Sequence, residues 1–595
     1  MCGVFGYIGN KTNIAPLVLE GLKSLEYRGY DSWGVAVVAL NLQPEIKNKI
    51  YFKKRIGKIG GANVDSLPAG SLAIGHTRWA THGGVTRENA HPHLDCTESI
   101  ALIHNGIVEN YIDLKKELLA GNHVFKSETD TEVIVHLLEE NSRKLSFEEA
   151  FLKTFNQLEG LNAIVAIDKK ERVILAARKG SPLVIGFGKN EHFIASDPSA
   201  LLPFTKDVYF LEDDQMAIIK DDSVKIININ SAKEVKFLKQ MLDWDVSSAE
   251  IGEFEHFMIK EIYDQPAVIH DIANNAIVGS DNILSLINEA EDIYLVGCGT
   301  ASYACLVGKA LFSKIAKKQV HAAIGSEFED QLKFINKKSL IIALSQSGET
   351  IDLLEPVRKA QQKGAKILAF VNVLGSSLFR MADEKILIGA GLEKAVASTK
   401  AFIGKISHLL LLAYALDKRK SQGQRLLLEA VESIRIILQE KNLKNIKKLA
   451  HKISNEKDIF VIGRGLYFPA SLEAALKIKE ISYIHAEGVA AGELKHGPLA
   501  LVEKDTPCIV LLPDDETTAL TLANAMEMKA RGGYIIGISS INHGVFDFYL
   551  PIANIGEASV LPMVVVSQLL AYYLTLEKKL DPDKPRNLAK SVTVR

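Results

Sequence analysis

The second residue of the chain is a cysteine, and its position suggests a nucleophile. Removal of Met1 would leave a thiol and an α-amine on the same residue. A free thiol titrates at about 8.5 and an α-amine at about 8, so the amine can accept the thiol proton and later return it to a leaving group. A small residue in an early strand would look the same, so neighbouring motifs have to decide.

Three motifs further along carry groups that suit acyl transfer. They are HTRWATHG (76–83), HNG (104–106) and SETDTE (127–132). Acyl transfer needs two donors aimed at a developing oxyanion, and the Asn105 amide and the Gly106 backbone N–H supply such a pair. Asp130 stands where a helix is expected to begin, and an exposed carboxylate there would hold an α-ammonium. Asn-Gly is also a common hairpin turn, and Asp130 could be only an N-cap.

A second set of polar residues follows the strand-like run SLIIAL. The strand is predicted to end at Leu344 and a helix to begin at about Glu349, with Gly348 allowing a tight turn. Hydroxyls and free backbone amides at a helix N-terminus form a phosphate cradle without a basic residue. An ordinary capped helix is the alternative. The candidate phosphate ligands are Ser345, Gln346, Ser347 and Thr350.

Candidate proton-transfer groups lie in ALKIKEISYIHAEGVAAGELKHGPLAL (475–501). Lys477 and Glu480 stand three apart and share one face of a predicted helix. An ammonium beside a partly buried carboxylate suits aldose–ketose proton transfer, although such a pair is often only a solvated surface pair. His496 falls in a predicted loop and could assist ring opening. Lys590 lies in a C-terminal tail too apolar to be plain disorder.

The kind of secondary structure predicted to position these groups changes near residue 240. Short apolar runs before it predict strands with a few helices. The polar, acidic segment 243–256 is a predicted linker. DIYLVGCG (292–299) and DIFVIGRG (458–465) then form a weak repeat, each continuing as strand–helix alternation, which predicts two copies of a parallel-sheet domain. Neither copy completes GxGxxG, so a nucleotide site is not expected.

Composition narrows the possible functions. The 595 residues carry a net charge of −2, which gives no general attraction to nucleic acid or an anionic membrane. The start of the chain does not read as a signal peptide, and Val560 to Leu576 is expected to be a buried core helix. Five cysteines without a CxxC pair fit reduced thiols in the cytoplasm. No ligand motif suggests a metal site, and no cofactor is implied.

The first group of motifs resembles the glutaminase domain of class II glutamine amidotransferases, the N-terminal nucleophile family. CGVFGYIG, EYRGYDS, HTRWATHG, NAHPH, HNGIVEN and SETDTE occur in that family's order, through about residue 215. The resemblance implies Cys2 as the nucleophile and Asn105 and Gly106 as oxyanion donors. It also implies that Trp79 is the gate of an ammonia channel. The implied glutamine-pocket residues are Arg78, Thr81, His82 and Asp130.

The second group resembles the isomerase half of the glucosamine-6-phosphate synthase family, built from two sugar-isomerase (SIS) domains. GCGT, SQSGET, VASTKAF, LKIKEISYIHAE, GELKHGP and PRNLAKSVTV match it in order. The resemblance implies Glu480 as isomerisation base assisted by Lys477, His496 as ring opener from the neighbouring subunit, and Lys590 as Schiff-base lysine. The implied sugar-phosphate ligands are Thr300, Ser345, Gln346, Ser347, Thr350 and Ser398.

Three departures from that pattern put affinity details in doubt. Ala301 replaces a common Ser, Glu393-Lys394 stands where Glu-Ile-Gly is usual, and the chain ends in Arg595. None of the three replaces a predicted catalytic group.

The resemblances together imply an α/β multidomain protein: an N-terminal αββα sandwich, then two parallel-sheet αβα SIS domains. The expected limits are 2–240 for the glutaminase, 241–284 for the linker and connecting helix, 285–430 and 431–584 for the SIS domains, and 585–595 for the catalytic tail. The expected activity is glutamine-dependent amination and isomerisation of D-fructose 6-phosphate by a cytoplasmic homodimer, with L-glutamine as the ammonia donor.

Rival functions need features that the sequence does not show. Amidophosphoribosyltransferase would need a pyrophosphate loop, and asparagine synthetase an ATP-binding SGGxDS-type loop. A sugar-phosphate-sensing transcription factor would need a helix-turn-helix and a basic face. A fructosamine-phosphate deglycase would leave the glutaminase half without a purpose.

Overall fold

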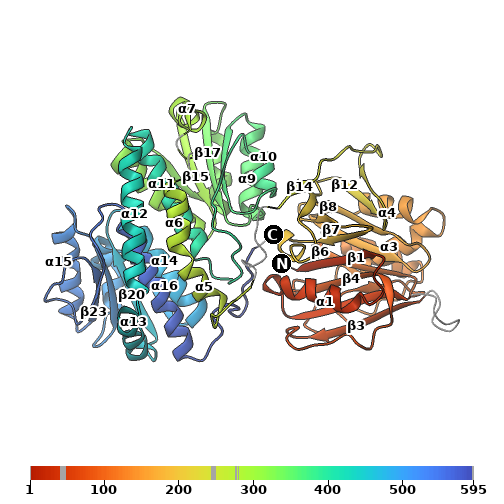
Figure 1. The fold of residues 1–595 in the computed structure, drawn as a ribbon, viewed down its shortest axis with the longest axis horizontal. Helices are drawn as coiled ribbons and strands as arrows, with labels where there is room; N and C mark the ends of the chain where they lie inside the picture. Colours follow the sequence, from red (N-terminus) through yellow and green to blue (C-terminus); the bar gives the residue numbers. More distant parts are fainter. Residues whose placement is uncertain (1, 40–48, 243–249, 275–277, 279, 592–595) are drawn as a thin grey trace. The chain divides into compact units, whose positions relative to one another are not determined.

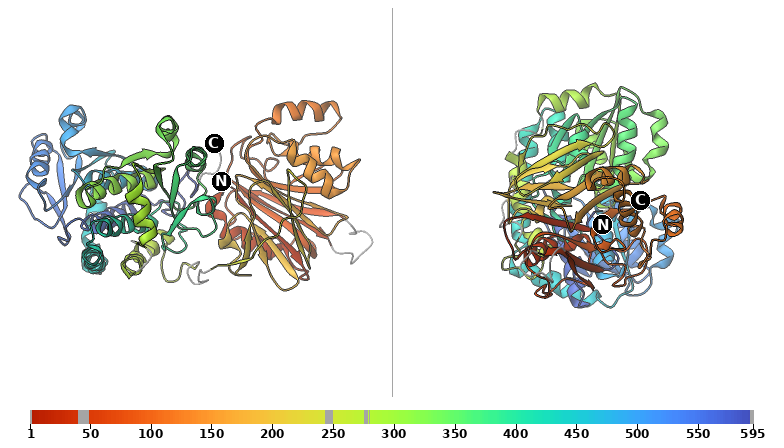
Figure 2. Two further views of the ribbon diagram at one scale, coloured as in Figure 1. Left: turned by 90° about the horizontal axis from the view of Figure 1, so that it is seen from above. Right: turned by 90° about the vertical axis from the view of Figure 1, so that its right-hand side faces the viewer.

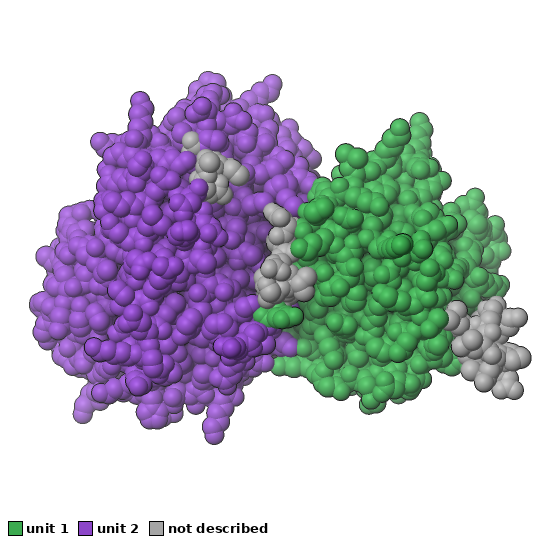
Figure 3. All heavy atoms as spheres, viewed as in Figure 1, with its two compact units in different colours: residues 1–250, 589–595 green, residues 251–588 purple. Residues whose placement is uncertain are grey.

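The computed structural model describes residues 2–39, 49–242, 250–274, 278 and 280–591. It divides into two compact units: unit 1 is Met1–Glu250 with Ala589–Arg595, and unit 2 is Ile251–Leu588 (Figure 3). Met1 and residues 243–249 of the predicted linker lie outside the described residues.

Unit 1 contains two antiparallel sheets (Figure 1). The first has the order β14-β11-β9-β10-β1-β4-β2-β3, with strands Gln240–Met241, Asp207–Phe210, Val184–Phe187, Glu191–Ala195, Gly3–Gly9, Gly70–Arg78, Ser32–Ala39 and Ile50–Ile56. The second has the order β13-β12-β8-β7-β6-β5, with strands Val224–Asn228, Gln215–Ile219, Ile174–Lys179, Asn162–Asp168, Ile100–Gly106 and His93–Leu94.

The two sheets pack face to face, and helices cover their outer faces. One core joins Val4 and Ile74 of the first sheet to Ile103 and Val165 of the second. Helix α1 (Ala15–Ser24) packs on the outer face of the first sheet. Helices α2 (Tyr111–Ala120), α3 (Glu132–Ser142) and α4 (Phe147–Asn156) cover the second sheet, as the orange helices in Figure 2 show. The expected αββα sandwich is confirmed.

Unit 2 contains two five-stranded sheets in which every pairing is parallel. The first has the order β16-β15-β17-β18-β19, with strands His321–Ile324, Asp292–Gly297, Ser339–Ser345, Lys366–Val371 and Glu384–Leu387. The second has the order β21-β20-β22-β23-β24, with strands His485–Ala490, Asp458–Gly463, Pro507–Leu512, Tyr534–Ser539 and Phe548–Pro551. Corresponding strands occupy corresponding places, so the predicted repeat of one domain is confirmed.

Helices cover both faces of each parallel sheet, as expected for βαβ connections. They are α5 (Phe257–Tyr263), α6 (Gln265–Asn274), α7 (Asp281–Glu289), α8 (Thr300–Leu311), α9 (Ile351–Gln362), α10 (Ser377–Met381), α11 (Lys400–Leu416), α12 (Lys420–Ile437), α13 (Glu440–Ile453), α14 (Tyr467–Ser482), α15 (Thr518–Lys529) and α16 (Val560–Glu577). The predicted domain limits after residues 284 and 430 therefore fall inside α7 and α12.

Helix α16 is apolar around its whole circumference. Among the described residues it is the one helix long and apolar enough to cross a membrane, but 94% of its apolar window is buried inside the molecule. An all-round apolar helix of this kind belongs in a core. The prediction of a buried core helix is confirmed.

Candidate active sites

Cys2 lies directly before β1, against the end of β4. The Trp79 backbone N–H donates to its Sγ at 3.3 Å, and Sγ lies 3.6 Å from the Trp79 carbonyl oxygen. Burial raises the pKa of the Cys2 thiol, while the Trp79 N–H and the Arg78 guanidinium act to lower it. The thiol is thus held beside a backbone donor but needs a base, which is the role predicted for its own α-amine.

Asn105 lies at the end of β6, and its side-chain amide reaches the nucleophile. Its Nδ2 donates to the Cys2 carbonyl oxygen at 2.9 Å, and the second amide hydrogen remains for a substrate oxygen. Asn105 and Gly106 pair with Ala163 and Asn162 of β7, so this Asn-Gly is not a hairpin turn. A Cβ on Gly106 would lie 2.1 Å from the Leu161 carbonyl oxygen, so only glycine fits there.

His76 fixes the orientation of the Asn105 amide. Its Nε2 donates to Asn105 Oδ1 at 3.1 Å and lies 3.0 Å from the His104 carbonyl oxygen. Burial lowers the pKa of His76 to about 3, so the ring is neutral and has a single N–H to donate. His76 has no predicted role, because a histidine inside a buried strand looks like an ordinary core polar residue.

The remaining predicted glutamine ligands surround the loop after β4. The Arg78 guanidinium donates to the carbonyl oxygens of His82, Gly83 (3.2 Å) and Gly84 (3.0 Å), so it shapes this loop. Thr81 is exposed. Buried Nδ1 of His82 has no hydrogen-bond partner among the described residues, which leaves it for a ligand. The predicted gate, Trp79, is half-buried.

Asp130 differs from its expected environment. An exposed carboxylate was predicted here, but the residue is 3% exposed and its Oδ2 accepts the Val108 backbone N–H at 2.8 Å. Helix α3 begins at Glu132 with Thr131 at its N-cap position, so Asp130 is not that cap. Its carboxylate instead joins the start of α3 to the segment after β6.

The predicted phosphate loop follows β17 as expected, with α9 starting at Ile351 and Thr350 as its N-cap residue. Ser345 Oγ accepts the Gly348 N–H at 2.9 Å, and Ser347 Oγ accepts the Glu349 N–H at 3.2 Å. The Ser345 bond uses a hydroxyl lone pair and leaves the Ser345 O–H to donate to an anion. Gln346 and Thr350 are half-buried beside them.

Lys477 is buried between two carboxylates of α14. It forms ion pairs with Glu480 and with Glu473, the latter at 3.3 Å, and donates to Thr300 Oγ1 at 3.1 Å. The predicted shared face of Lys477 and Glu480 is confirmed, and the pair is not a solvated one. Although burial alone would lower it, the two carboxylates raise the pKa of Lys477.

Glu473 is the residue of this cluster that sequence analysis missed. It is fully buried, and its Oε2 has no hydrogen-bond partner among the described residues. Burial raises the pKa of Glu473 to about 7, outweighing the effect of Lys477. Its position four residues before Lys477 on the same helix was the available signal.

Ser398 is held by Glu393, the residue directly before the Lys394 departure from the family pattern. The Ser398 hydroxyl donates to Glu393 Oε2 at 3.1 Å, and Glu393 Oε1 accepts the backbone N–H groups of Thr399 (2.9 Å) and Ala401 (3.0 Å). Glu393 thus shapes the loop before α11 and contacts a predicted sugar-phosphate ligand. Ala301, another departure, is buried in the first turn of α8.

Two predicted catalytic residues remain, His496 and Lys590. His496 is exposed and ends a 3₁₀ helix, Ala491–His496, where a loop was expected. Lys590 belongs to the short stretch, Ala589–Arg595, that is grouped with unit 1.

The structure also assembles residues that sequence analysis did not connect. No metal site was expected, yet the donor atoms of Cys96, His123, His136 and Glu139 all lie within 4.8 Å of one another. These residues come from three segments of unit 1, so no short motif revealed them.

Comparisons with known proteins agree with both sets of motifs. The SIS domain model matches residues 286–415 and 452–575, and the glutamine amidotransferase domain model matches residues 76–203. Glutamine–fructose-6-phosphate aminotransferase (isomerizing) of Caldanaerobacter subterraneus is 43% identical over 620 residues, which span 100% of both chains. The protein of the same name from Pyrococcus horikoshii is 42% identical over 612 residues, again 100% of both.

The chain belongs to the glutamine–fructose-6-phosphate aminotransferase (isomerizing) family. A solved structure of the C-terminal domain of such an aminotransferase from Francisella tularensis is 33% identical and matches with a TM-score of 0.53. It covers 56% of this chain and 100% of that one. In this aminotransferase family member, the glutamine amidotransferase half therefore carries Cys2 and Asn105. The SIS half carries Lys477 and Glu480.

Proposed function

We propose that this protein converts L-glutamine and D-fructose 6-phosphate into L-glutamate and glucosamine 6-phosphate. The observation that carries the proposal is the presence, on one chain, of a thiol beside an amide donor and of a buried Lys–Glu pair. The full-length relatives carry the corresponding name. Membership of the aminotransferase family supports coupling of the two chemistries.

In unit 1, Cys2 is the proposed nucleophile. Its thiolate attacks the glutamine amide carbon, and the oxyanion receives hydrogen bonds from the Asn105 Nδ2 and the Gly106 N–H. Collapse of this intermediate breaks the C–N bond, and the α-amine of Cys2 protonates the departing ammonia. Water then hydrolyses the thioester to glutamate and restores the thiol.

In unit 2, the loop after β17 is the proposed phosphate site and Glu480 the proposed base. The ketose carbonyl oxygen leaves as water when the Lys590 amine condenses with C2, and ammonia then displaces that amine to give the ketose imine. Glu480 then removes a proton from C1 and returns it to C2, which converts the ketose imine to the aldose amine. Lys477, held against Glu480, stabilises negative charge that develops on the sugar oxygens.

Four further parts of the proposal do not rest on contacts described above. Trp79 gates the ammonia path, and Lys590 forms a Schiff base with the open ketose. His496 opens the sugar ring from the neighbouring subunit of a homodimer, which suits its exposure. The protein works in the cytoplasm without a cofactor.

Product analysis with labelled glutamine tests the proposal. With fructose 6-phosphate and glutamine carrying heavy nitrogen at its amide, mass spectrometry should find that nitrogen in glucosamine 6-phosphate. Cys2→Ala should make no product from glutamine yet still form it from added ammonia. An unlabelled sugar product, or wild-type synthesis by Cys2→Ala, would refute it. Borohydride with fructose 6-phosphate should trap Lys590, and an adduct on Lys477 or Lys479 instead would refute the tail's role.

A further inference from the structure

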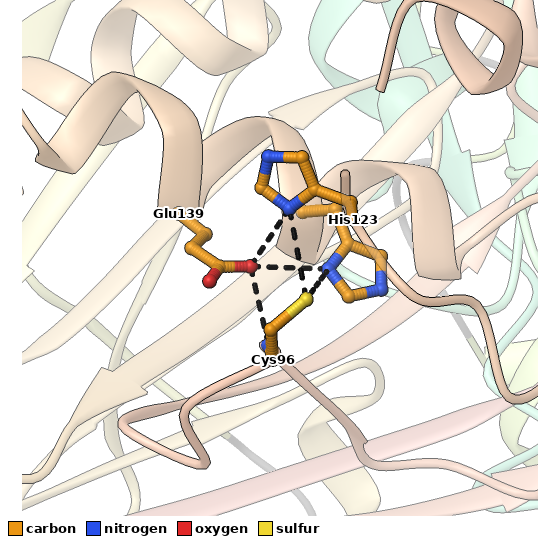
Figure 4. A group of neighbouring side chains, drawn as sticks. Cys96, His123 and Glu139 are labelled. Atoms are coloured by element: carbon orange, nitrogen blue, oxygen red, sulfur yellow. Dashed lines mark hydrogen bonds and ion pairs between the residues drawn. The ribbon is translucent and has the colours of Figure 1, made fainter. Parts of the chain in front are cut away.

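Four side chains of unit 1 converge away from the predicted glutamine ligands. Cys96 lies in the loop between β5 and β6, His123 follows α2, and His136 and Glu139 lie on α3. Figure 4 shows Cys96, His123 and Glu139 pointing toward one common centre. Each contributes one donor atom to a group spanning no more than 4.8 Å.

The separations between these donor atoms match a tetrahedral zinc site. Zn–S bonds of about 2.3 Å and Zn–N or Zn–O bonds of about 2.0 Å place sulfur about 3.5 Å from nitrogen and nitrogen about 3.3 Å from oxygen. Cys96 Sγ lies 3.8 Å from His123 Nδ1 and 3.6 Å from His136 Nδ1. Glu139 Oε2 lies 3.0 Å from His123 Nδ1 and 3.2 Å from His136 Nδ1.

The far ring nitrogens of both histidines face carboxylates. His123 Nε2 hydrogen-bonds Glu140 Oε2 at 3.2 Å, whereas His136 Nε2 faces Glu132 Oε1 at 3.7 Å and has no hydrogen-bond partner among the described residues. A zinc-binding histidine usually donates its other N–H to such a carboxylate, which fixes the tautomer with a bare nitrogen toward the metal. Glu132 is itself fixed by the backbone N–H groups of Lys126 (2.8 Å) and Ser127 (2.7 Å).

Burial and charge also suit a divalent cation. The side chains of His123 and His136 are 1% exposed and that of Glu139 is 11% exposed, while Cys96 is exposed and offers a path from solvent. A divalent cation bound to the Cys96 sulfur would deprotonate the thiol. Thiolate and carboxylate would then neutralise the two positive charges of zinc.

We propose that Cys96, His123, His136 and Glu139 bind a structural Zn²⁺ ion. A thiolate with two imidazoles favours zinc over magnesium or calcium, and four protein ligands leave no open position for catalysis. The ion joins three segments of the chain. One of them continues into β6, which carries Asn105 and Gly106 at its end, and another is α3, which begins directly after Asp130 and Thr131. Zinc therefore stabilises the elements that carry predicted glutamine-site residues.

Metal analysis of the purified full-length chain tests this site. After reconstitution with zinc and removal of loosely bound ions by gel filtration, elemental analysis should find about one zinc ion per chain. Cys96→Ala should lose it, whereas Cys508→Ala, which removes a buried thiol of unit 2, should keep it. Chelation should lower the melting temperature of the wild type and leave that of Cys96→Ala unchanged.

Cobalt substitution supplies a readout independent of folding stability. Co²⁺ in the wild type should give the visible bands of a tetrahedral ion and a near-ultraviolet sulfur-to-metal band. Cys96→His, which replaces one ligand by another, should keep the visible bands and lose the sulfur band. Zinc content far below one per chain, equal zinc in Cys96→Ala, or a cobalt spectrum without the sulfur band would each show that the four residues form only a hydrogen-bonded cluster.

Discussion

At the scale of single residues, the Asn105 amide is the group whose removal should most selectively slow glutamine hydrolysis. Its Nδ2 lies 2.9 Å from the Cys2 carbonyl oxygen, where it can reach an oxyanion formed at the thiol. Asn105→Ala should lower kcat by about 10²–10³-fold, the usual effect of losing one oxyanion donor, and change KM less. Steady-state glutaminase kinetics would measure this. Asn230→Ala, at an exposed asparagine of unit 1, is the control, and a rise in KM alone would show that Asn105 only binds substrate.

Glu473 predicts a pH dependence of stability with an unusual sign. Burial raises its pKa to about 7 from a value near 4.5 in the unfolded chain. Between these two pKa values the folded state therefore holds a proton that the unfolded state has released. The contribution of Glu473 to the free energy of unfolding is fully present below about pH 4.5 and is lost as the pH rises to about 7. The loss is about 1.4 kcal/mol for each unit of difference between the two pKa values. Relative to Glu473→Gln, the wild type should lose melting temperature between pH 5 and pH 8. A constant difference across that range would mean that Glu473 stays ionised.

The sequence predicts the residues that belong to compact motifs. Cys2, Asn105 and the Lys477–Glu480 pair are predictable because position, strand end or helical spacing marks each one. His76 and Cys96 are not, since their partners lie in distant segments that only the fold brings together. Glu473 lies between these cases, because its spacing to Lys477 was visible but its complete burial was not.

At the scale of elements, the turn after β17 depends on Gly348. Its φ is +67°, and an added Cβ would lie 2.1 Å from Ser376 Oγ. Positive φ alone costs an alanine about 1–2 kcal/mol, and the clash must also displace the loop. Gly348→Ala should therefore raise KM for the sugar phosphate by about tenfold or more while glutamine hydrolysis is unchanged.

Gly389 provides the matched control for this turn. Its φ is +71°, but nothing lies within 4 Å of an added Cβ, so Gly389→Ala imposes the backbone strain without the clash. Isothermal titration with fructose 6-phosphate would compare both variants with the wild type. Equal affinity of the Gly348→Ala variant and the wild type would contradict a phosphate site at this loop.

The helices and strands themselves were easier to predict than the residues at which they end or the burial of the residues next to them. The apolar run before Ser345 marks a buried strand, and it ends one residue after the predicted Leu344. Helix α9 starts two residues after the predicted Glu349, because Gly348 has positive φ and Thr350 is still extended. The burial of Asp130 was unpredictable, since it depends on packing of the segment that carries Val108.

At the scale of the whole molecule, the hydrophobic cores determine which pieces can fold alone. Each core cluster of described residues lies within one unit. Within unit 2, however, one continuous core contains Leu295 and Leu344 of the first parallel sheet together with Val461 and Ile538 of the second. The repeat is therefore visible in sequence and topology, but the two copies share a core and do not form separate folding units.

Two fragments test this difference. A fragment of residues 251–595 keeps the whole shared core, so it should show a cooperative thermal transition by circular dichroism and bind fructose 6-phosphate without using glutamine. A fragment of residues 251–430 keeps the first sheet but exposes its core face, which includes Leu295 and Leu344, and it also cuts α12. An exposed core face favours aggregation or a loosely packed state, so this fragment should lack a cooperative transition.

The same pairing of sheets places Thr300 of the first copy against Lys477 of the second, so even a folded short fragment would lack half of the predicted sugar site. Cooperative unfolding of residues 251–430 at the temperature of the longer fragment would show that the first copy is stable without the shared core.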